Sequence, residues 1–323
     1  MRIFALALAA ALITACSGGG VAPSAPQSYQ ASNASAPSSS SATVTISSAM
    51  LSSPPSYSNL QTHLLPVQTT GKPILASHMI RPKAIAYPDD MNYHGGAVLQ
   101  RSVQHDIFVD CPGSCWGVPQ RFQANLNLSS FVHVLDQYVG TTANDRYPVG
   151  TIFLVNQTFY TNMVSQNDLF TIIHAAAKVA GTGYGHTYHV FLKPGLDTCF
   201  DFGPCYSPDV PSQWTFCAYH GSLTYSDIGH VIFSVEPNQN VPGCGDVGIS
   251  PLPNPVPIDS AATTLSHEFS ESVSDPDVGS GWYNLFGQEI GDVCDVYRAY
   301  ETLHGHPYII QPEYSNAGHG CFY

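Results

Sequence analysis

Eight cysteines spread over residues 111–321 constrain the fold of this chain more than any other feature of its sequence. An even number of cysteines in an exported chain indicates disulfide bonds rather than free thiols. Eight cysteines allow about a hundred pairings, and the sequence alone does not choose among them. Their order nevertheless suggests local pairs, namely Cys111 with Cys115, Cys199 with Cys205, Cys217 with Cys244, and Cys294 with Cys321. We therefore expect a loop-rich domain held together by disulfides.

The N-terminus predicts export. Arg2 precedes an apolar run from Ile3 to Ile13, and small residues lead to Cys16, as in a secretory signal. The run is shorter than the roughly 20 residues that a membrane-spanning helix requires. The segment ending at Cys16 resembles the bacterial lipobox, so we expect Cys16 to be acylated and to attach the chain to a lipid membrane. The alternative is an ordinary cleaved signal with an incidental cysteine.

Composition divides the rest of the chain in two. Residues 17–74 begin with a stretch rich in Ser, Ala and Pro, which has too little apolar surface to fold and predicts a flexible tether. Residues 75–323 are long enough for one globular domain. Ser17, directly after the predicted acylation site, resembles signals sorted to an outer membrane. The expected location is the bacterial cell envelope, as an outer-membrane lipoprotein, or the extracellular space.

The charge balance excludes some partners. The chain has 10 Lys and Arg against 23 Asp and Glu, a formal net charge of −13. Such a field repels phosphate backbones, so we expect no nucleic-acid partner and no binding to an anionic membrane surface.

Strand-like and helix-like segments alternate along the predicted domain. Runs rich in branched and aromatic residues predict strands at 106–110, 150–156, 187–192 and 230–235. Helical spacing of apolar residues predicts helices at 129–138, 166–179 and 260–274, with Ser129, Asn167 and Asp259 or Ser260 as N-caps. This order indicates an α/β or α+β domain with a central sheet.

The segment from Ser266 to Pro276 carries the clearest chemical signal. His267 and Glu271 are four residues apart, so on a helix they share one face. Glu268 lies between them, as does the catalytic glutamate of the zincin motif HExxH, which accepts a proton from a metal-activated water. Here the second histidine is replaced by Glu271, which weakens the specific resemblance to a protease.

A second acidic segment follows this predicted helix. Glu289 and Asp292 lie downstream, which resembles the gluzincin arrangement of a third ligand and a nearby aspartate that orients the first histidine. The predicted roles are His267, Glu271 and Glu289 as metal ligands, Glu268 as general base, and Asp292 as the residue that holds His267. The expected metal is zinc. A site with two carboxylates also suits manganese or calcium.

Other side chains offer alternatives. His94 and His220 each stand between a tyrosine and a glycine, a context that we interpret first as a turn and second as an imidazole presented to a cleft. His304, His306 and His319 are alternative third ligands, although exposed loops are the preferred interpretation. The aromatic residues, Trp116, Trp214 and Trp282 among them, could form a groove that stacks on sugar rings.

Several multi-residue blocks together resemble the phosphate-induced protein 1 or EXORDIUM-like family. They occur in family order over residues 91–321 and comprise Met91-Asn-Tyr-His-Gly-Gly-Ala-Val98, Cys111-Pro-Gly-Ser-Cys115, Cys217-Ala-Tyr-His-Gly221, Pro242-Gly-Cys244, His267-Glu-Phe-Ser-Glu271, Asp275-Pro276, Trp282-Tyr-Asn284 and Glu289-Ile-Gly-Asp-Val-Cys294. Plant members are secreted, cell-wall-associated proteins, so the resemblance implies an extracellular setting but no substrate. The lipoprotein-like N-terminus departs from the plant pattern.

Two functional hypotheses follow. The first is a surface-tethered metallohydrolase with a single zincin-like domain, most plausibly a peptidase, acting on a peptide, protein or cell-wall glycan. The second is a non-catalytic cell-surface or carbohydrate-binding domain, in which the carboxylates bind calcium or nothing. Convergence of His267, Glu271 and Glu289 on one point favours the first hypothesis. An all-oxygen cage around Asp275 and Asp277 favours the second.

Overall fold

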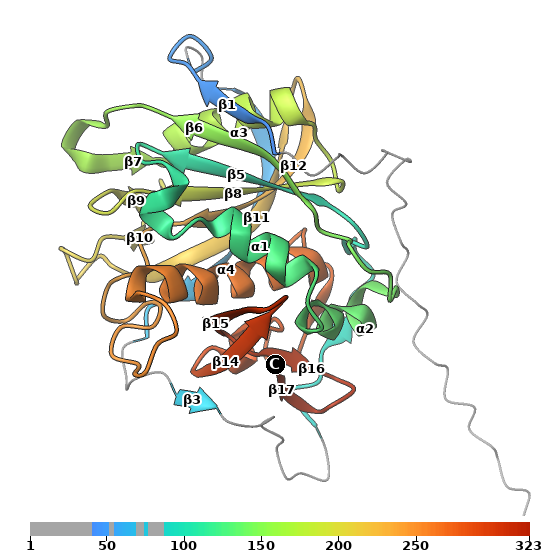
Figure 1. Ribbon diagram of the computed structural model, residues 1–323. Coiled ribbons are helices and arrows are strands. Elements are labelled where there is room, and N and C mark those ends of the chain that lie inside the picture. Colours follow the sequence, from blue (N-terminus) through green and yellow to red (C-terminus); the bar gives the residue numbers. More distant parts are fainter. Residues whose placement is uncertain (1–40, 52–54, 69–73, 77–86) are drawn as a thin grey trace, which may run out of the picture.

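The computed structural model describes residues 41–51, 55–68, 74–76 and 87–323. The predicted signal peptide and Cys16 lie outside the described residues. Within them, the chain forms an α/β structure built on a mixed sheet of seven strands, with the order β1-β6-β5-β8-β12-β11-β2 (Figure 1). The strands from β1 to β12 in this order are parallel, whereas β11 is antiparallel to both of its neighbours, β12 and β2.

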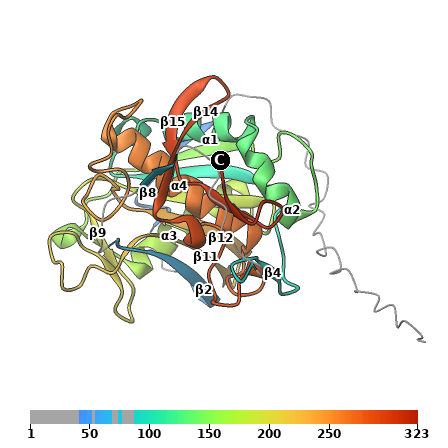
Figure 2. The same ribbon diagram turned by 90° about the horizontal axis from the view of Figure 1, so that it is seen from below.

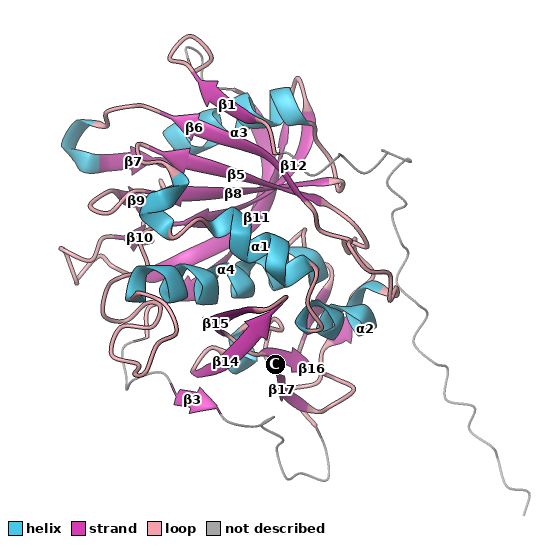
Figure 3. Cartoon of the chain, in the orientation of Figure 1, coloured by secondary structure: helices cyan, strands magenta, loops and turns pink. Residues whose placement is uncertain are grey.

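The strands of the central sheet are β1 (Thr43–Ile46), β2 (Tyr57–Pro66), β5 (Val103–Val109), β6 (Val149–Val155), β8 (His186–Leu192), β11 (Phe216–Tyr225) and β12 (Gly229–Glu236). Smaller sheets contain β3 (Ile74–Ala76), β4 (Asn92–Tyr93), β7 (Met163–Ser165), β9 (Asp197–Cys199), β10 (Cys205–Tyr206), β13 (Trp282–Tyr283), β14 (Tyr297–Leu303), β15 (His306–Ile310), β16 (Glu313–Ser315) and β17 (Gly320–Phe322). The described α-helices are α1 (Pro119–Asn127), α2 (Asp136–Val139), α3 (Gln166–Ala180) and α4 (Val256–Ser274), shown in cyan in Figure 3.

The predicted α/β class with a central sheet is confirmed, and β5, β6, β8 and β12 match the four predicted strands. Successive side chains of a strand point to opposite faces of the sheet, and this alternation explains how the strands pack. In β5, Ile107 and Val109 join the core under α3, while Phe108 between them joins the core under α4. One sheet therefore supports two separate apolar cores.

The predicted helices are present, but their N-caps differ. Ser165 caps α3 in a capping box with Asp168, so Asn167 lies inside the helix. Helix α4 begins at Val256, so Asp259 and Ser260 also lie inside it, because Pro255 ends the preceding extended segment. The predicted helix at 129–138 is a 3₁₀ turn followed by the short α2.

Helix α4 occupies the middle of the molecule. It contacts β11 and β12 of the central sheet on one side and β15 on the other, and Figure 1 shows it between that sheet and the small strands β14–β17. In the view turned by 90°, β14–β15 and β2 lie on opposite sides of it (Figure 2). As a result, even its polar side chains from Ser260 to Ser274 are buried.

Two N-terminal strands correct the predicted tether. Residues 43–46 and 57–66 were expected in the flexible segment 17–74, yet they form β1 and β2 at the two edges of the central sheet. The interpretation failed because Ser and Pro in the surrounding sequence masked strands whose apolar residues pack on the sheet, such as Ile46 and Leu65. The folded unit thus includes residues well before 75.

The four local disulfides suggested by cysteine order are all present. Such bonds persist in oxidising compartments, so they indicate an extracytoplasmic location. No helix in the described ranges combines the length and apolar character needed to cross a membrane.

Candidate functional site

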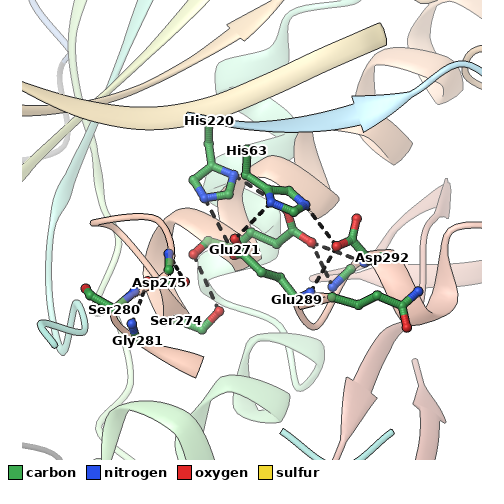
Figure 4. Close-up of polar contacts among 12 residues, drawn as sticks. His63, His220, Glu271, Ser274, Asp275, Ser280, Gly281, Glu289 and Asp292 are labelled. Atoms are coloured by element: carbon green, nitrogen blue, oxygen red, sulfur yellow. Dashed lines mark hydrogen bonds and ion pairs between the residues drawn. The ribbon is translucent and has the colours of Figure 1, made fainter. Parts of the chain in front are cut away.

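Seven side chains from four parts of the chain meet where α4 packs on strand β11, near one edge of the central sheet. We call this set the His/Glu cluster; it comprises His63, His220, His267, Glu268, Glu271, Glu289 and Asp292. Figure 4 shows His63 and His220 pointing from strands β2 and β11 toward the carboxylates of Glu271, Glu289 and Asp292.

The helix supplies the centre of the cluster. His267 and Glu271 are one turn apart on α4, and the His267 Nε2 atom lies 3.1 Å from Glu271 Oε2. Glu268 lies close by, with its Oε2 atom 3.4 Å from the Nδ1 atom of His220. The predicted juxtaposition of these helix residues is therefore present.

The two strands place their histidines side by side. His63 and His220 are register partners in the β2–β11 pair, so their side chains leave the same face of the sheet. Gly221, the next residue, allows this close pairing: a Cβ atom there would lie 2.1 Å from the carbonyl oxygen of Gln61 on β2. The Tyr-His-Gly context thus belongs to a strand, and its interpretation as a turn at His220 was wrong.

The segment after β13 closes the cluster. Glu271 Oε1 accepts hydrogen bonds from the backbone N–H groups of Gly291 and Asp292, both at 3.1 Å. A Cβ atom at Gly291 would lie 2.5 Å from His267 Nδ1, so only glycine fits. The disulfide between Cys294 and Cys321 fixes the end of this segment to β17.

The buried atoms of the cluster lack hydrogen-bond partners. They are both ring nitrogens of His220, Nε2 of His267, both oxygens of Glu268, and the Oε2 atoms of Glu271 and Glu289. Buried polar atoms are normally paired, and donor atoms around a zinc-sized ion are about 3.3 Å apart when the ion lies ~2 Å from each. The separations here are 3.1–3.6 Å. The residues therefore fit a bound cation.

Electrostatics supports the same conclusion. Burial, and then the neighbouring Glu236 and Glu271, raise the pKa of Glu268 well above its usual value. Burial, Glu271 and Asp275 likewise raise the pKa of Glu289. Burial lowers the pKa of His220 well below its usual value, and the nearby His63 adds to the shift. A neutral His220 carries one ring proton, so its other nitrogen presents a lone pair to carboxylates unless a cation lies between them.

His63 has a different environment. Its burial favours the neutral ring, but the hydrogen bond to Asp292 and the charge of Glu271 raise its pKa to about 9. The His63 Nε2 atom lies 2.9 Å from Asp292 Oδ2, and Nδ1 lies 3.4 Å from Glu289 Oε1. His63 and Asp292 are also the most accessible members, with side chains 22% and 12% exposed.

The predicted ligands divide between two groups. Donor atoms within 4.8 Å of one another occur in three sets that share Glu271: His267 with Glu268, His220 with Glu289, and His63 with Asp292. Glu271 thus lies close to each of the other two predicted ligands, His267 and Glu289. Among the described residues, His267 and Glu289 do not occur in the same set. Glu268, the predicted base, belongs to the same set as His267 and Glu271, so its carboxylate is also placed to act as a metal ligand.

The predicted role of Asp292 is corrected. Its carboxylate turns toward His63 and accepts the N–H of Glu289 at 2.9 Å. The place beside His267 belongs to Gln311, whose amide nitrogen donates to His267 Nδ1 at 2.7 Å and to the carbonyl of Gly291 at 2.9 Å. The Nδ1 atom of His267 is thus engaged by Gln311, and its Nε2 atom faces Glu271 at 3.1 Å. Both ring nitrogens of His220 lack a hydrogen-bond partner, so His220 is the histidine better prepared to bind a cation.

The other candidate histidines lie outside the cluster. His94 is exposed and stacks on Tyr283. His304 and His306 are exposed around the turn between β14 and β15, and His319 pairs with Asp90.

The predicted sugar groove and oxygen cage also find no support in the described residues. Trp116 is buried in the core, whereas Trp214 packs on Tyr206 and Trp282 on Tyr138. Asp275 accepts three backbone N–H groups, from Gly279, Ser280 and Gly281. Asp277 accepts hydrogen bonds from Tyr184 and Ser222. Both aspartates are thus engaged by protein donors.

Comparison of the chain with family models, with curated proteins and with solved structures finds no match. The resemblance to the EXORDIUM-like family therefore stays an expectation, and the functional argument depends on the geometry of the His/Glu cluster.

Proposed function

We propose that this protein is an extracytoplasmic, metal-dependent hydrolase of the zincin type, most plausibly a peptidase. One observation carries the proposal: unpartnered nitrogen and carboxylate atoms of His220, Glu268, Glu271 and Glu289 converge in a buried site. A divalent cation bound there would polarise a substrate carbonyl and make a nearby water more acidic. Zinc or manganese suits this mixed nitrogen and oxygen donor set.

The protein's own residues have separate tasks. Glu271 is held rigid by the backbone N–H groups of Gly291 and Asp292, so it offers Oε2 to the cation at a fixed point. Glu268 has both oxygens without partners, and burial together with Glu236 favours its protonated form. A carboxylate whose affinity for a proton is raised in this way is suited to accept a proton from a bound water.

The substrate would approach from the side of His63 and Asp292, because these are the accessible members of the cluster. An imidazole and a carboxylate at that entrance could bind the polar backbone of a peptide by hydrogen bonds. The position of His63 and Asp292 at the entrance therefore favours substrates in which a polar group lies next to the scissile carbonyl.

The burial of the cluster favours a second candidate. His220, His267, Glu268 and Glu271 are all 0% exposed, whereas a catalytic metal needs an open coordination position. A closed site of this kind would serve a non-catalytic cell-surface domain, with the cation stabilising the fold.

Glu268→Gln separates the two candidates. Glutamine keeps an oxygen donor but cannot accept a proton at neutral pH, so at a saturating metal concentration a hydrolase should retain its metal and lose about 100- to 10,000-fold in kcat/KM. Metal content is measured by mass spectrometry, and activity with a quenched-fluorescent peptide library. Glu301→Gln, on β14, is the matched control. Metal in the wild type without hydrolysis of any peptide, ester or glycan substrate would leave the non-catalytic domain as the function.

A further inference from the structure

We infer that the His/Glu cluster binds two divalent cations, one on each side of the His220 imidazole. The inference deepens the proposed function and rests on its metal site. The first position lies among the Nδ1 atom of His220, Glu268 and Glu271, and the second lies among the Nε2 atom of His220, Glu289 and the Nδ1 atom of His63.

The geometry of His220 carries the inference. Its side chain is fully buried, and neither ring nitrogen has a hydrogen-bond partner. Nδ1 lies 3.4 Å from Glu268 and 3.5 Å from Glu271, while Nε2 lies 3.6 Å from Glu289. These separations exceed those of good hydrogen bonds. Because the two ring nitrogens point in different directions, one ion cannot bind both, and carboxylates lie beside each of them. Binding of an ion at each nitrogen releases the remaining ring proton of His220 to solvent, so His220 would bridge the two ions as an imidazolate.

Each side provides a donor set. On the first side, Glu268 and Glu271 contribute unpartnered oxygens. If Glu268 uses Oε2 for the ion, its Oε1 atom remains for proton transfer. On the second side, Glu289 contributes an unpartnered Oε2. There the Nδ1 atom of His63 lies 3.4 Å from Glu289, while its Nε2 atom lies 2.9 Å from Asp292. Asp292 therefore orients the His63 ring, and a cation beside Nδ1 takes the place of a proton on that nitrogen.

The charge of the cluster also favours bound cations. The cluster contains four carboxylates, from Glu268, Glu271, Glu289 and Asp292. In the described part of the chain, none of the ion pairs made by Lys or Arg involves them. Bound cations would supply positive charge to these buried carboxylates beyond that of His63, and uncompensated buried charge is costly in a water-poor environment.

A pair of ions changes the chemistry that the site can serve. Two-metal centres hold both the attacking and the leaving oxygen of a hydrolytic reaction. The arrangement predicts that activity requires both positions to be filled, so a half-loaded protein should have little activity even though it has bound metal tightly.

The test is a titration of the metal-free, full-length protein with Co²⁺, followed by calorimetry and visible absorption. We expect two ions per chain for the wild type and one for His63→Gln. His174→Gln, on α3 at the opposite face of the sheet, is the matched control and should keep both. Circular dichroism shows whether each variant is folded, and Glu289→Gln, expected to bind one ion, replaces His63→Gln if that variant unfolds.

Each result has a distinct meaning. A single ion in the wild type would overturn the two-ion inference and leave the proposed hydrolase intact, whereas no bound ion would overturn both. Two ions that remain in both His63→Gln and Glu289→Gln would place the second ion elsewhere and also overturn the inference. As a further check, the Mn²⁺-loaded wild type should show the electron paramagnetic resonance of two coupled ions, and two uncoupled signals would contradict the shared His220.

Discussion

The two faces of the central sheet differ although the same strands form both. Toward α3, the sheet presents apolar side chains such as Ile107, Phe153 and Val190, which form one continuous core with that helix. Toward α4, the same strands present buried polar groups, among them Asp106, His189 and Glu236. Alternate residues of a strand point to opposite faces. The same strands can therefore present apolar side chains that stabilise the fold toward α3 and polar side chains toward α4.

The polar groups on the α4 face form a network that leads to the His/Glu cluster. Gln104 accepts a hydrogen bond from His189 Nε2 at 2.7 Å, His189 Nδ1 meets Ser234, and Ser234 donates to Glu236 at 2.9 Å. Burial raises the pKa of Glu236 to about 8, although the hydrogen bond from Ser234 opposes the shift. The buried polar groups of this face lower the free energy of unfolding. The apolar core on the opposite face and a bound cation must compensate for that loss.

The largest effect should come from damaging the α3 face. Phe170→Ala removes a fully buried ring that packs on Tyr57 and Phe233, and should lower the free energy of unfolding by about 3–5 kcal/mol. Metal content should not change. Chemical denaturation and metal analysis of the same sample test both points, and a loss of metal in the folded variant would show that the two faces are coupled.

Removing the metal should be the next largest effect, confined to the α4 face. At a free metal concentration of 100 to 1,000 times the dissociation constant, a ligand of the folded state contributes about 3–4 kcal/mol. A chelator should therefore lower the melting temperature, and added zinc or manganese should restore it. Magnesium at the same concentration is the control. A melting temperature that does not respond to chelation would contradict the distinction between the faces.

A change at Glu271 should reduce metal affinity without a comparable loss of stability. Glu271→Gln keeps an acceptor for Gly291 and Asp292 but removes one buried charge, so metal affinity should fall about 100-fold, or about 2.7 kcal/mol. The metal-free variant should be at least as stable as the metal-free wild type, because repulsion among buried carboxylates decreases. Glu313→Gln, a buried glutamate in β16, is the comparison, and should change metal affinity less.

Near neutral pH, the smallest effect should be a pH dependence of stability on the α3 face. Burial, and then the nearby His186, lower the pKa of His105 from 6.5 to about 3. Between these pH values the unfolded chain binds a proton that the folded protein does not, so His105 makes stability fall as pH falls from 6.5 toward 3. His105→Gln should reduce the slope by up to about 1.4 kcal/mol per pH unit. Denaturation at several pH values measures it, with the exposed His304→Gln as control. An unchanged slope would contradict the burial of a neutral His105.

Sequence patterns of short range predicted much of this arrangement. Alternation and helical spacing located β5, β6, β8, β12, α3 and α4, because these patterns depend on neighbours within a few residues. The spacing of His267 and Glu271 located the centre of the site for the same reason. The disulfides followed from cysteine order.

Contacts between distant segments were not predictable. His63 lies in a strand surrounded by Ser- and Pro-rich sequence, and its partner Asp292 is 229 residues away. His220 lies in β11, whose residues are almost all buried, so no alternation revealed which side chain faces α4. The close approach that Gly221 permits was the one local signal, and it was interpreted as a turn.

Strand β2 has a practical consequence for handling the protein. It covers one edge of the sheet by pairing with β11 along most of its length and contributes the buried Leu65. A fragment that began at residue 75 would expose the backbone N–H and C=O groups of β11 as a template for other chains. Such a fragment should form intermolecular sheets and precipitate, whereas a fragment that begins before Thr43 should stay monodisperse.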